Sequence, residues 1–213
     1  MQLYLQIDAL IAENELEAAI VLLGEVIDLQ RWRTVPHYDR GLCRQKLGQF
    51  ESAIVDYTHA IWMHRNGLGE EDADAFNNRG VAFQETKQFE RAFSDYAEAI
   101  RLAPRDPKAF FNRGNLWSEM GNEEKALVDY SKSIELDAAD PHVFYNRATS
   151  LFHLRRFEES LHDMNQSIQL DPNDVDAFVW RWRIYKKLGD KERAEADLRE
   201  AKRLDNWVEE PAK

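Results

Sequence analysis

The chain has 213 residues, of which 44% are hydrophobic and 31% are charged, so it can bury a core and form one large or two small domains. Its 28 lysines and arginines are outnumbered by 39 aspartates and glutamates, and the net charge is −11. Phosphate groups are bound by an excess of cations, so this balance argues against nucleic-acid or anionic-membrane partners.

The single cysteine, Cys43, excludes an intrachain disulfide and a zinc site made of cysteines. No apolar stretch approaches the length that spans a bilayer, so we expect no membrane insertion. The N-terminus has no basic segment and reaches Asp8 before any long apolar run, unlike a secretory signal. Together these features predict a cytoplasmic protein.

Two sequence motifs recur together at a spacing of 34 residues. The first reads AFNNRG at 75–80, AFFNRG at 109–114 and VFYNRA at 143–148. The second reads FERAFSDYAEAI at 89–100, EEKALVDYSKSI at 123–134 and FEESLHDMNQSI at 157–168. More divergent copies precede and follow these three. We therefore predict one domain of six repeats, near 1–33, 34–72, 73–106, 107–140, 141–174 and 175–208, with an insertion at 66–72 and a tail at 209–213.

Each repeat carries two apolar stripes with helical periodicity, which predicts a helix–turn–helix unit. In the third repeat Phe76, Gly80 and Phe83 share one helix face. Glycines such as Gly121 separate the two stripes, and Pro104 follows the second stripe, where a proline ends a helix. The sequence thus predicts an all-α chain made of helix pairs.

The repeat resembles the tetratricopeptide repeat, and the resemblance covers nearly the whole chain. The third repeat carries the family's pattern in Phe76, Gly80, Phe83, Ala92, Tyr96, Ala99 and Pro104. The resemblance implies an all-α, right-handed superhelical solenoid in which the first helix of each pair lines a concave groove. It also implies a protein or peptide as the partner.

The last repeat replaces apolar residues of its second helix with Glu195 and Lys202. A polar outer face is what a terminal repeat needs in water, so we interpret this helix as a cap. The array is then expected to end here, as a near-complete domain.

Two charged columns run through repeats two to six, and each aspartate follows its arginine by 16 residues. The arginines are Arg40, Arg79, Arg113, Arg147 and Arg181, and the aspartates are Asp56, Asp95, Asp129, Asp163 and Asp197. One interpretation is a basic stripe that binds a ligand. The matched spacing instead favours structural ion pairs that join the two helices of each repeat.

No arrangement for catalysis or metal binding is evident in the sequence. Cys43 falls on a core-facing helix position, where a thiol acts as a small apolar group. Histidines such as His59 and His64 are spaced so that they do not share a helix face. No phosphate-binding glycine loop or nucleophile-elbow motif occurs. We therefore expect no enzyme activity, no cofactor and no metal.

Asparagine recurs at one register of the first helix in three consecutive repeats, as Asn78, Asn112 and Asn146, with Asn115 one turn after Asn112. Asparagine is a poor residue inside a helix, and its amide both donates and accepts hydrogen bonds. Such a column can grip the main chain of an extended peptide. The alternative is an ordinary exposed polar position. The column stops at Asp39 and Trp180, so it spans only repeats three to five.

Aromatic and cationic residues lie beside the asparagine column. We expect ligand side chains to be anchored by Phe111, Tyr145, Phe152 and Trp180, although packing between neighbouring repeats explains them equally well. Near the end of the first helix of the last repeat, Arg183, Lys186 and Lys187 are expected to attract an acidic segment of a ligand. The alternative for these cations is a solvated helix end, where positive charge complements the helix dipole.

A carboxylate clamp, with which some family members bind acidic chaperone tails, is not expected here. Asn112 and Asn146 match its asparagines. Its lysines are replaced, for example by Asn77, His142 and Asp176.

The sequence thus predicts a non-catalytic scaffold that binds an extended peptide or a partner helix in its groove. The alternative is an assembly module that associates through its ends and outer surface, where Trp32, Trp62 and Trp207 are candidates.

Overall fold

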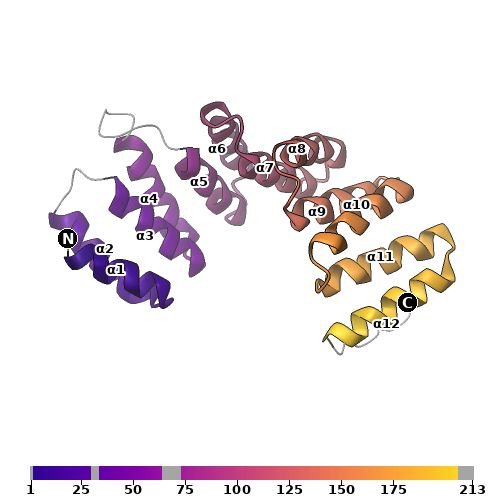
Figure 1. Cartoon of the computed structure of the whole chain (residues 1–213). Coiled ribbons are helices and arrows are strands. Elements are labelled where there is room, and N and C mark those ends of the chain that lie inside the picture. The colour runs from indigo at the N-terminus through magenta and orange to yellow at the C-terminus, as the bar shows by residue number, and fades with distance from the viewer. Residues whose placement is uncertain (1, 30–33, 64–72, 206–213) are drawn as a thin grey trace. The chain divides into compact units, whose positions relative to one another are not determined.

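The regular structure is entirely helical in a computed structural model of the chain, which describes residues 2–29, 34–63 and 73–205 (Figure 1). Its helices are, in chain order, α1 (Gln2–Ala12), α2 (Leu16–Leu29), α3 (Val35–Lys46), α4 (Phe50–Met63), α5 (Ala73–Glu85), α6 (Phe89–Leu102), α7 (Pro107–Glu119), α8 (Glu123–Leu136), α9 (Pro141–His153), α10 (Phe157–Leu170), α11 (Val175–Leu188) and α12 (Lys191–Asp205). They alternate as the first and second helices of six pairs, which fits about six repeats. The predicted all-α fold class is confirmed for the described residues.

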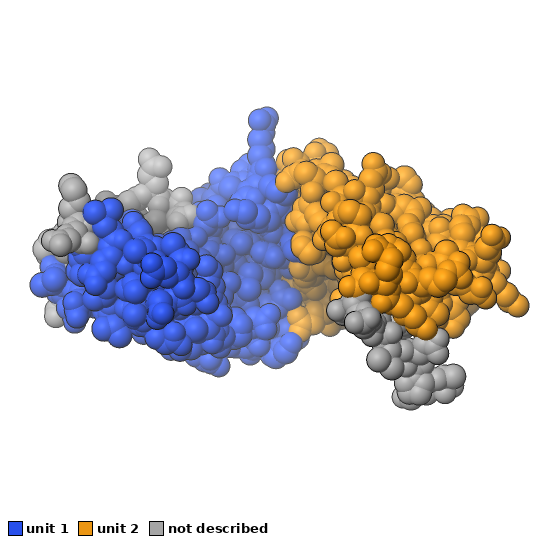
Figure 2. Space-filling model, turned by 60° about the horizontal axis from the view of Figure 1, so that its bottom comes forward, with its two compact units in different colours: residues 1–112 blue, residues 113–213 orange. Residues whose placement is uncertain are grey.

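The chain divides into two compact units, Met1–Asn112 and Arg113–Lys213 (Figure 2). In the first unit α3 packs against α4 and α5 against α6, and the second helices α2 and α4 also contact the first helix that follows them. In the second unit α9 packs against α10 and α11 against α12, and α8 and α10 make the same onward contact. Each unit is therefore a stack of helix pairs. The division of the chain into one domain of six repeats stays a prediction. The predicted insertion at 66–72 and the predicted tail at 209–213 lie outside the described residues.

The turn between the two helices of each repeat passes through one residue with a left-handed backbone. The residues at this register are, in chain order, Asn14, Gly48, Lys87, Gly121, Arg155 and Gly189, with φ between 60° and 79°. Glycine adopts this conformation without penalty, whereas residues with a Cβ atom rarely do. The turn geometry therefore persists in the three repeats whose sequence carries no glycine there.

The two helices of repeats two, three and four approach closely where a glycine faces a buried tyrosine. The pairs are Gly41 with Tyr57, Gly80 with Tyr96 and Gly114 with Tyr130. A Cβ atom on these glycines would lie 2.6–2.7 Å from the tyrosine ring, which is closer than carbon atoms pack. The corresponding residues are Ala148 and Met164 in repeat five and Trp182 and Leu198 in repeat six. A larger residue on the first helix thus accompanies a smaller one on the second.

Candidate functional site

Ion pairs join the first and second helices of repeats two to six, counted over the described part of the chain. They are Arg40–Asp56, Arg79–Asp95, Arg113–Asp129, Arg147–Asp163 and Arg181–Asp197, with shortest N···O distances of 2.6–2.7 Å. The aspartates are buried, and each arginine contacts both oxygens of its carboxylate. Removing one partner of such a pair leaves a charge without compensation. This geometry supports a structural role for both columns.

Asp56 of repeat two is fully buried and has a second arginine partner. Arg44 Nη1 lies 2.7 Å from Asp56 Oδ2, and His37 Nδ1 lies 3.8 Å from Oδ1. The His37 ring stacks on His59 with a centroid distance of 5.2 Å. Burial alone raises the pKa of Asp56, but His37, Arg40 and Arg44 together outweigh it and hold this pKa below its usual value. The carboxylate therefore stays ionised inside the helix pair.

One register of the first helices accepts the hydroxyl groups of buried tyrosines. In repeats two and three Tyr57 Oη donates to Gln45 at 2.9 Å, and Tyr96 Oη donates to Gln84 at 3.0 Å. Repeats five and six carry Met164 and Leu198 in the tyrosine register, so they have no such hydroxyl. The residues aligned with Gln45 and Gln84 are there Phe152 and Lys186. In the last two repeats, the residue at this register of the first helix therefore has no tyrosine hydroxyl to accept.

The asparagine column bridges neighbouring repeats. The hydrogen bonds run from Asn78 Nδ2 to Tyr38 Oη, from Asn112 Nδ2 to Asn77 Oδ1 and from Asn146 Nδ2 to Asn115 Oδ1, each 2.9 Å long. Asn115 Oδ1 also accepts from Tyr130 Oη at 2.8 Å. An amide has two N–H donors and a carbonyl oxygen with two lone pairs, so one bridge uses part of its capacity. The column therefore helps to hold repeats together, a role that the sequence did not indicate.

Aromatic rings cluster between α9 and α11 in the second unit. The Phe152 ring lies 5.5 Å from that of Trp180 and 5.3 Å from that of Phe157, both edge to face. The His153 ring lies 6.1 Å from Trp180. Edge-to-face contacts of this kind stabilise a cluster beyond the burial of its surface. The structure thus brings together Phe152 and Trp180, which the sequence placed in adjacent repeats.

Beside these rings lies a hollow of about 300 Å³, which we call the basic hollow, lined by Phe152, Trp182, Arg183, Lys186 and Lys187. The Arg183 guanidinium lies 4.9 Å from the centre of the Trp180 ring, and Lys186 Nζ lies 4.4 Å from that of Trp182. Cations at these distances are attracted to the face of an indole. The basic hollow therefore combines apolar walls with positive charge.

The opposite end of α11 is acidic. Asp174 caps the helix by accepting from the backbone N–H groups of Asp176 and Ala177. Burial, reinforced by Asp176 and Asp174, raises the pKa of Tyr145 on α9 to about 12. The phenol of Tyr145 therefore stays protonated and can donate a hydrogen bond at neutral pH. Charge thus changes from negative to positive along α11.

Family models described as tetratricopeptide repeat match residues 73–106, 107–139, 141–174 and 183–206. These ranges cover more than half of the chain. The chain belongs to the tetratricopeptide repeat family. This membership confirms the resemblance found in the sequence and supports a protein–protein interaction scaffold, a class that is typically non-catalytic.

Solved structures of other tetratricopeptide proteins share this fold at low sequence identity. Pseudomonas aeruginosa pilF has a TM-score of 0.81 at 20% identity, covering 97% of this chain and 92% of that chain. YrrB, described as a TPR protein with an unusual peptide-binding site, has a TM-score of 0.66 at 17% identity, covering 86% and 92%. MamA from Desulfovibrio magneticus RS-1, from residue 41 to its end, has a TM-score of 0.71 at 15% identity, covering 81% and 95%. No curated protein sequence matches the chain.

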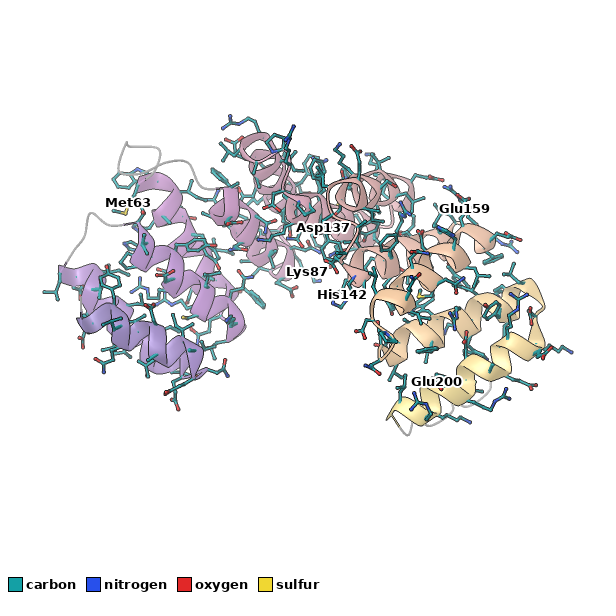
Figure 3. All side chains as sticks on the ribbon, viewed as in Figure 1. Met63, Lys87, Asp137, His142, Glu159 and Glu200 are labelled. Atoms are coloured by element: carbon teal, nitrogen blue, oxygen red, sulfur yellow. The ribbon has the colours of Figure 1, made fainter. Side chains whose placement is uncertain are left out.

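The predicted ligand-binding residues of this tetratricopeptide array fall in both units. Asn78, Phe111 and Asn112 belong to the first unit, and the aromatic cluster and the basic hollow belong to the second. His142, at a clamp register, is exposed at the start of α9 (Figure 3). Trp182, which lines the hollow, was not among the residues predicted to bind a ligand, and its register carries glycine in repeats two to four.

Within residues 2–29, 34–63 and 73–205, no three histidine, cysteine or acidic side chains come together as a metal site. No helix in the same ranges is long and apolar enough to cross a bilayer. Cys43 is buried, and this burial, together with Asp39, raises the pKa of its thiol. A thiol with a raised pKa is a poor nucleophile at neutral pH.

Proposed function

We propose that this tetratricopeptide array is a non-catalytic scaffold that binds an extended peptide along its first helices. The observation that carries the proposal is the face formed by α9 and α11, where Phe152 lies against Trp180 and also lines the basic hollow. Partly exposed aromatic side chains next to a concave surface are typical anchors for the side chains of a bound protein. The fold likeness to YrrB, which is described as having a peptide-binding site, agrees with this proposal.

The asparagine column supplies groups that suit a peptide main chain. Asn78, Asn112 and Asn146 are half-buried, and each uses one amide hydrogen for the bridge to the preceding repeat. The remaining donor and acceptor capacity of each amide matches the alternating C=O and N–H groups of an extended chain. We therefore assign main-chain recognition to these amides and side-chain recognition to the aromatic cluster. We place the scaffold in the cytoplasm and assign it neither a nucleic-acid partner nor a cofactor.

A peptide selection with cross-linking tests the location of binding. Peptides are selected from a random phage-displayed library on the immobilised full chain, synthesised with a photoreactive group, and cross-linked. Mass spectrometry is expected to find the cross-links on first helices, α9 and α11 among them. Cross-links confined to second helices such as α10 and α12 would reject binding along the first helices.

The same peptides test the asparagine column by calorimetry. Replacing Asn78, Asn112 and Asn146 together by alanine is expected to weaken binding about tenfold, because each lost hydrogen bond is worth roughly 1 kcal/mol and only part of the peptide main chain is affected. Asn173→Ala, in the exposed turn before α11, is the matched control and should leave binding unchanged. The unfolding of each variant is followed in parallel, since the triple substitution also removes three bridges between repeats. Unchanged binding in a folded triple variant would leave the column with a structural role only.

A second candidate function is assembly through the outer surface. Trp62 on α4 is 59% exposed and lines a hollow of about 340 Å³ with Thr58 and His59. Exposed tryptophans are enriched in protein interfaces. Sedimentation of the chain over a range of concentrations tests this function: an oligomer that is lost on Trp62→Ala favours assembly, and a monomer throughout rejects it. Trp32 and Trp207, the other candidates, lie outside the described residues.

A further inference from the structure

The basic hollow differs from the rest of the chain in the sign of its charge. The chain as a whole carries a net charge of −11, whereas the described residues that line the hollow include Arg183, Lys186 and Lys187 and no acidic residue. Glu123 is the carboxylate that contacts the neighbouring His153, at 3.0 Å, and it also accepts from Ser118. Positive charge therefore collects here in a protein whose average surface repels anions.

The helix dipole explains only part of this arrangement. Lys186 and Lys187 lie in the last turn of α11, where cations are generally favoured. The dipole does not account for the two indole rings against which Arg183 and Lys186 lie. A cation held over an indole face keeps its positive charge, which attracts an anionic ligand. The cations of the hollow are thus partly pre-positioned, which lowers the entropy cost of binding.

The comparison between repeats gives an independent argument. The register of Phe152 and Lys186 holds Gln45 and Gln84 in repeats two and three, where it accepts a tyrosine hydroxyl. Met164 and Leu198 remove that requirement in repeats five and six. An aromatic ring and a cation, rather than another polar amide, occupy the released positions. The apolar and the positive component of the hollow therefore arise at the same register.

Resting on the proposed function, we propose that the basic hollow binds an acidic segment of the peptide, with an aromatic or large aliphatic side chain between its carboxylates. The apolar side chain packs on Phe152 and Trp182, and the carboxylates pair with Lys186, Lys187 and Arg183. A volume of about 300 Å³ accommodates one large side chain. A nucleic acid carries a charge on every phosphate, so the net charge of −11 on the chain repels it more strongly than a peptide with a few carboxylates.

Three fluorescein-labelled peptides of equal length test the chemistry on the full chain. The first has glutamates flanking one phenylalanine, the second has glutamines in place of the glutamates, and the third has alanine in place of the phenylalanine. Fluorescence anisotropy is expected to show binding of the first peptide that weakens as salt is added. The other two are expected to bind about tenfold more weakly, because each lacks one of the two recognition components. Equal affinity of the glutamate and glutamine peptides would overturn the proposal.

Charge-reversal variants locate the binding. Lys186→Glu/Lys187→Glu is expected to weaken the glutamate peptide by about tenfold or more. Lys132→Glu/Lys191→Glu makes the same change in net charge on α8 and α12, outside the hollow, and is the matched control. An equal loss in both variants would show only long-range repulsion and would overturn the proposal.

Two other occupants are distinguished by the same variants. A labelled single-stranded oligothymidylate that binds more tightly than the glutamate peptide, and loses binding in Lys186→Glu/Lys187→Glu, would replace the peptide by a nucleic acid. A dimer of the chain that dissociates in this variant would replace it by a second copy. If library-selected peptides cross-link to α9 and α11 but are insensitive to both charge reversals, the acidic specificity fails while the proposed function stands. If no selected peptide cross-links to a first helix, the proposed function itself fails.

Discussion

Repeats two and six share one interaction and differ at nearly every neighbouring register. Both join their helices through an Arg–Asp pair, Arg40–Asp56 in one and Arg181–Asp197 in the other. At three other registers of the first helix, repeat two has Asp39, Gly41 and Gln45, and repeat six has Trp180, Trp182 and Lys186. The comparison teaches that the ion pair and the left-handed glycine turn, at Gly48 and Gly189, are kept while the surrounding registers of the first helix change their chemistry.

The cause of the difference is the residue on the second helix. Tyr57 in repeat two needs a glycine opposite its ring and an acceptor for its hydroxyl, and Gly41 and Gln45 meet those two needs. Leu198 in repeat six needs neither, because it is smaller and has no polar atom. Trp182 is therefore permitted in repeat six and excluded from repeat two by packing, and Lys186 occupies a register where repeat six has no tyrosine hydroxyl to accept.

The largest expected change in stability comes from removing the Arg–Asp ion pair that repeats two and six share. Asp56→Ala should lower the free energy of unfolding by about 3–5 kcal/mol, because it leaves Arg40 and Arg44 without their buried anion. Asp197→Ala should be less severe, since Arg181 also contacts Asn165. Urea unfolding followed by circular dichroism measures both. Glu200→Ala, which breaks an exposed pair on α12 (Figure 3), is the control and should change little. An equal effect of Glu200→Ala would contradict the role given to burial.

A smaller effect tests the close approach in repeat two. Gly41→Ala should lower the free energy of unfolding by about 1–3 kcal/mol, because the new methyl group overlaps the Tyr57 ring. Gly24→Ala is the matched control in α2, where the nearest atom to an added Cβ, Arg40 Nη1, is 3.7 Å away. That substitution should be neutral or stabilising by up to about 1 kcal/mol, as in other helix interiors. Thermal unfolding of the two variants distinguishes a steric cause from a general loss of glycine.

The smallest effect has the opposite sign and depends on pH. Burial and, to a lesser degree, the neighbouring Asp8 raise the pKa of Asp39 to about 6, whereas an unfolded aspartate has a pKa of about 3.9. The folded chain therefore binds this proton more tightly, and its stability should fall as the pH rises from about 4 to about 6. Asp39→Asn copies the residue of repeats three to five. It should raise the free energy of unfolding by roughly 1 kcal/mol at about pH 7, after allowing for solvent screening of the half-buried carboxyl, and not at about pH 4.

Urea midpoints of the wild type and of Asp39→Asn, measured across this pH range, check the sign. The two chains are expected to converge as the pH falls below about 4, where the carboxyl is protonated in both folded and unfolded states. A constant difference at every pH would mean that the asparagine stabilises through new hydrogen bonds rather than by removing a charge.

Most features of the fold could be predicted from the 34-residue repeat of the sequence. The helix pairs, the glycine turns and the spacing of 16 residues between Arg and Asp all follow from one periodic pattern, and the structure shows those Arg and Asp side chains within 2.7 Å. The backbone conformation was harder to predict at positions where the sequence departs from the repeat pattern. Lys87 and Arg155 adopt the left-handed turn conformation without being glycine, because the helices on either side impose it.

The candidate site was predicted only in part. Phe152, Trp180 and the cations of α11 were identified from their registers, whereas Trp182 was not among the residues predicted to bind a ligand. The bridges made by Asn78 and Asn146 were also missed, because their partners lie 40 and 31 residues earlier in the chain, at two different registers. The two bridges differ because Tyr38 offers its hydroxyl to Asn78, whereas Phe111, at the same register of repeat four, has no acceptor for Asn146. Asn146 therefore donates to Asn115 instead.

The sequence by itself determined the all-α fold, the helix pairs and the family, because a periodic apolar pattern specifies local helices and which of their faces must be buried. The tertiary structure alone decided which side chains meet across repeats. It joined Asn112 to Asn77, placed Arg183 over Trp180 and opened the basic hollow between α9 and α11. The reason is physical: contacts between stacked repeats depend on the size and rotamer of every residue packed between them, and no single register contains that information.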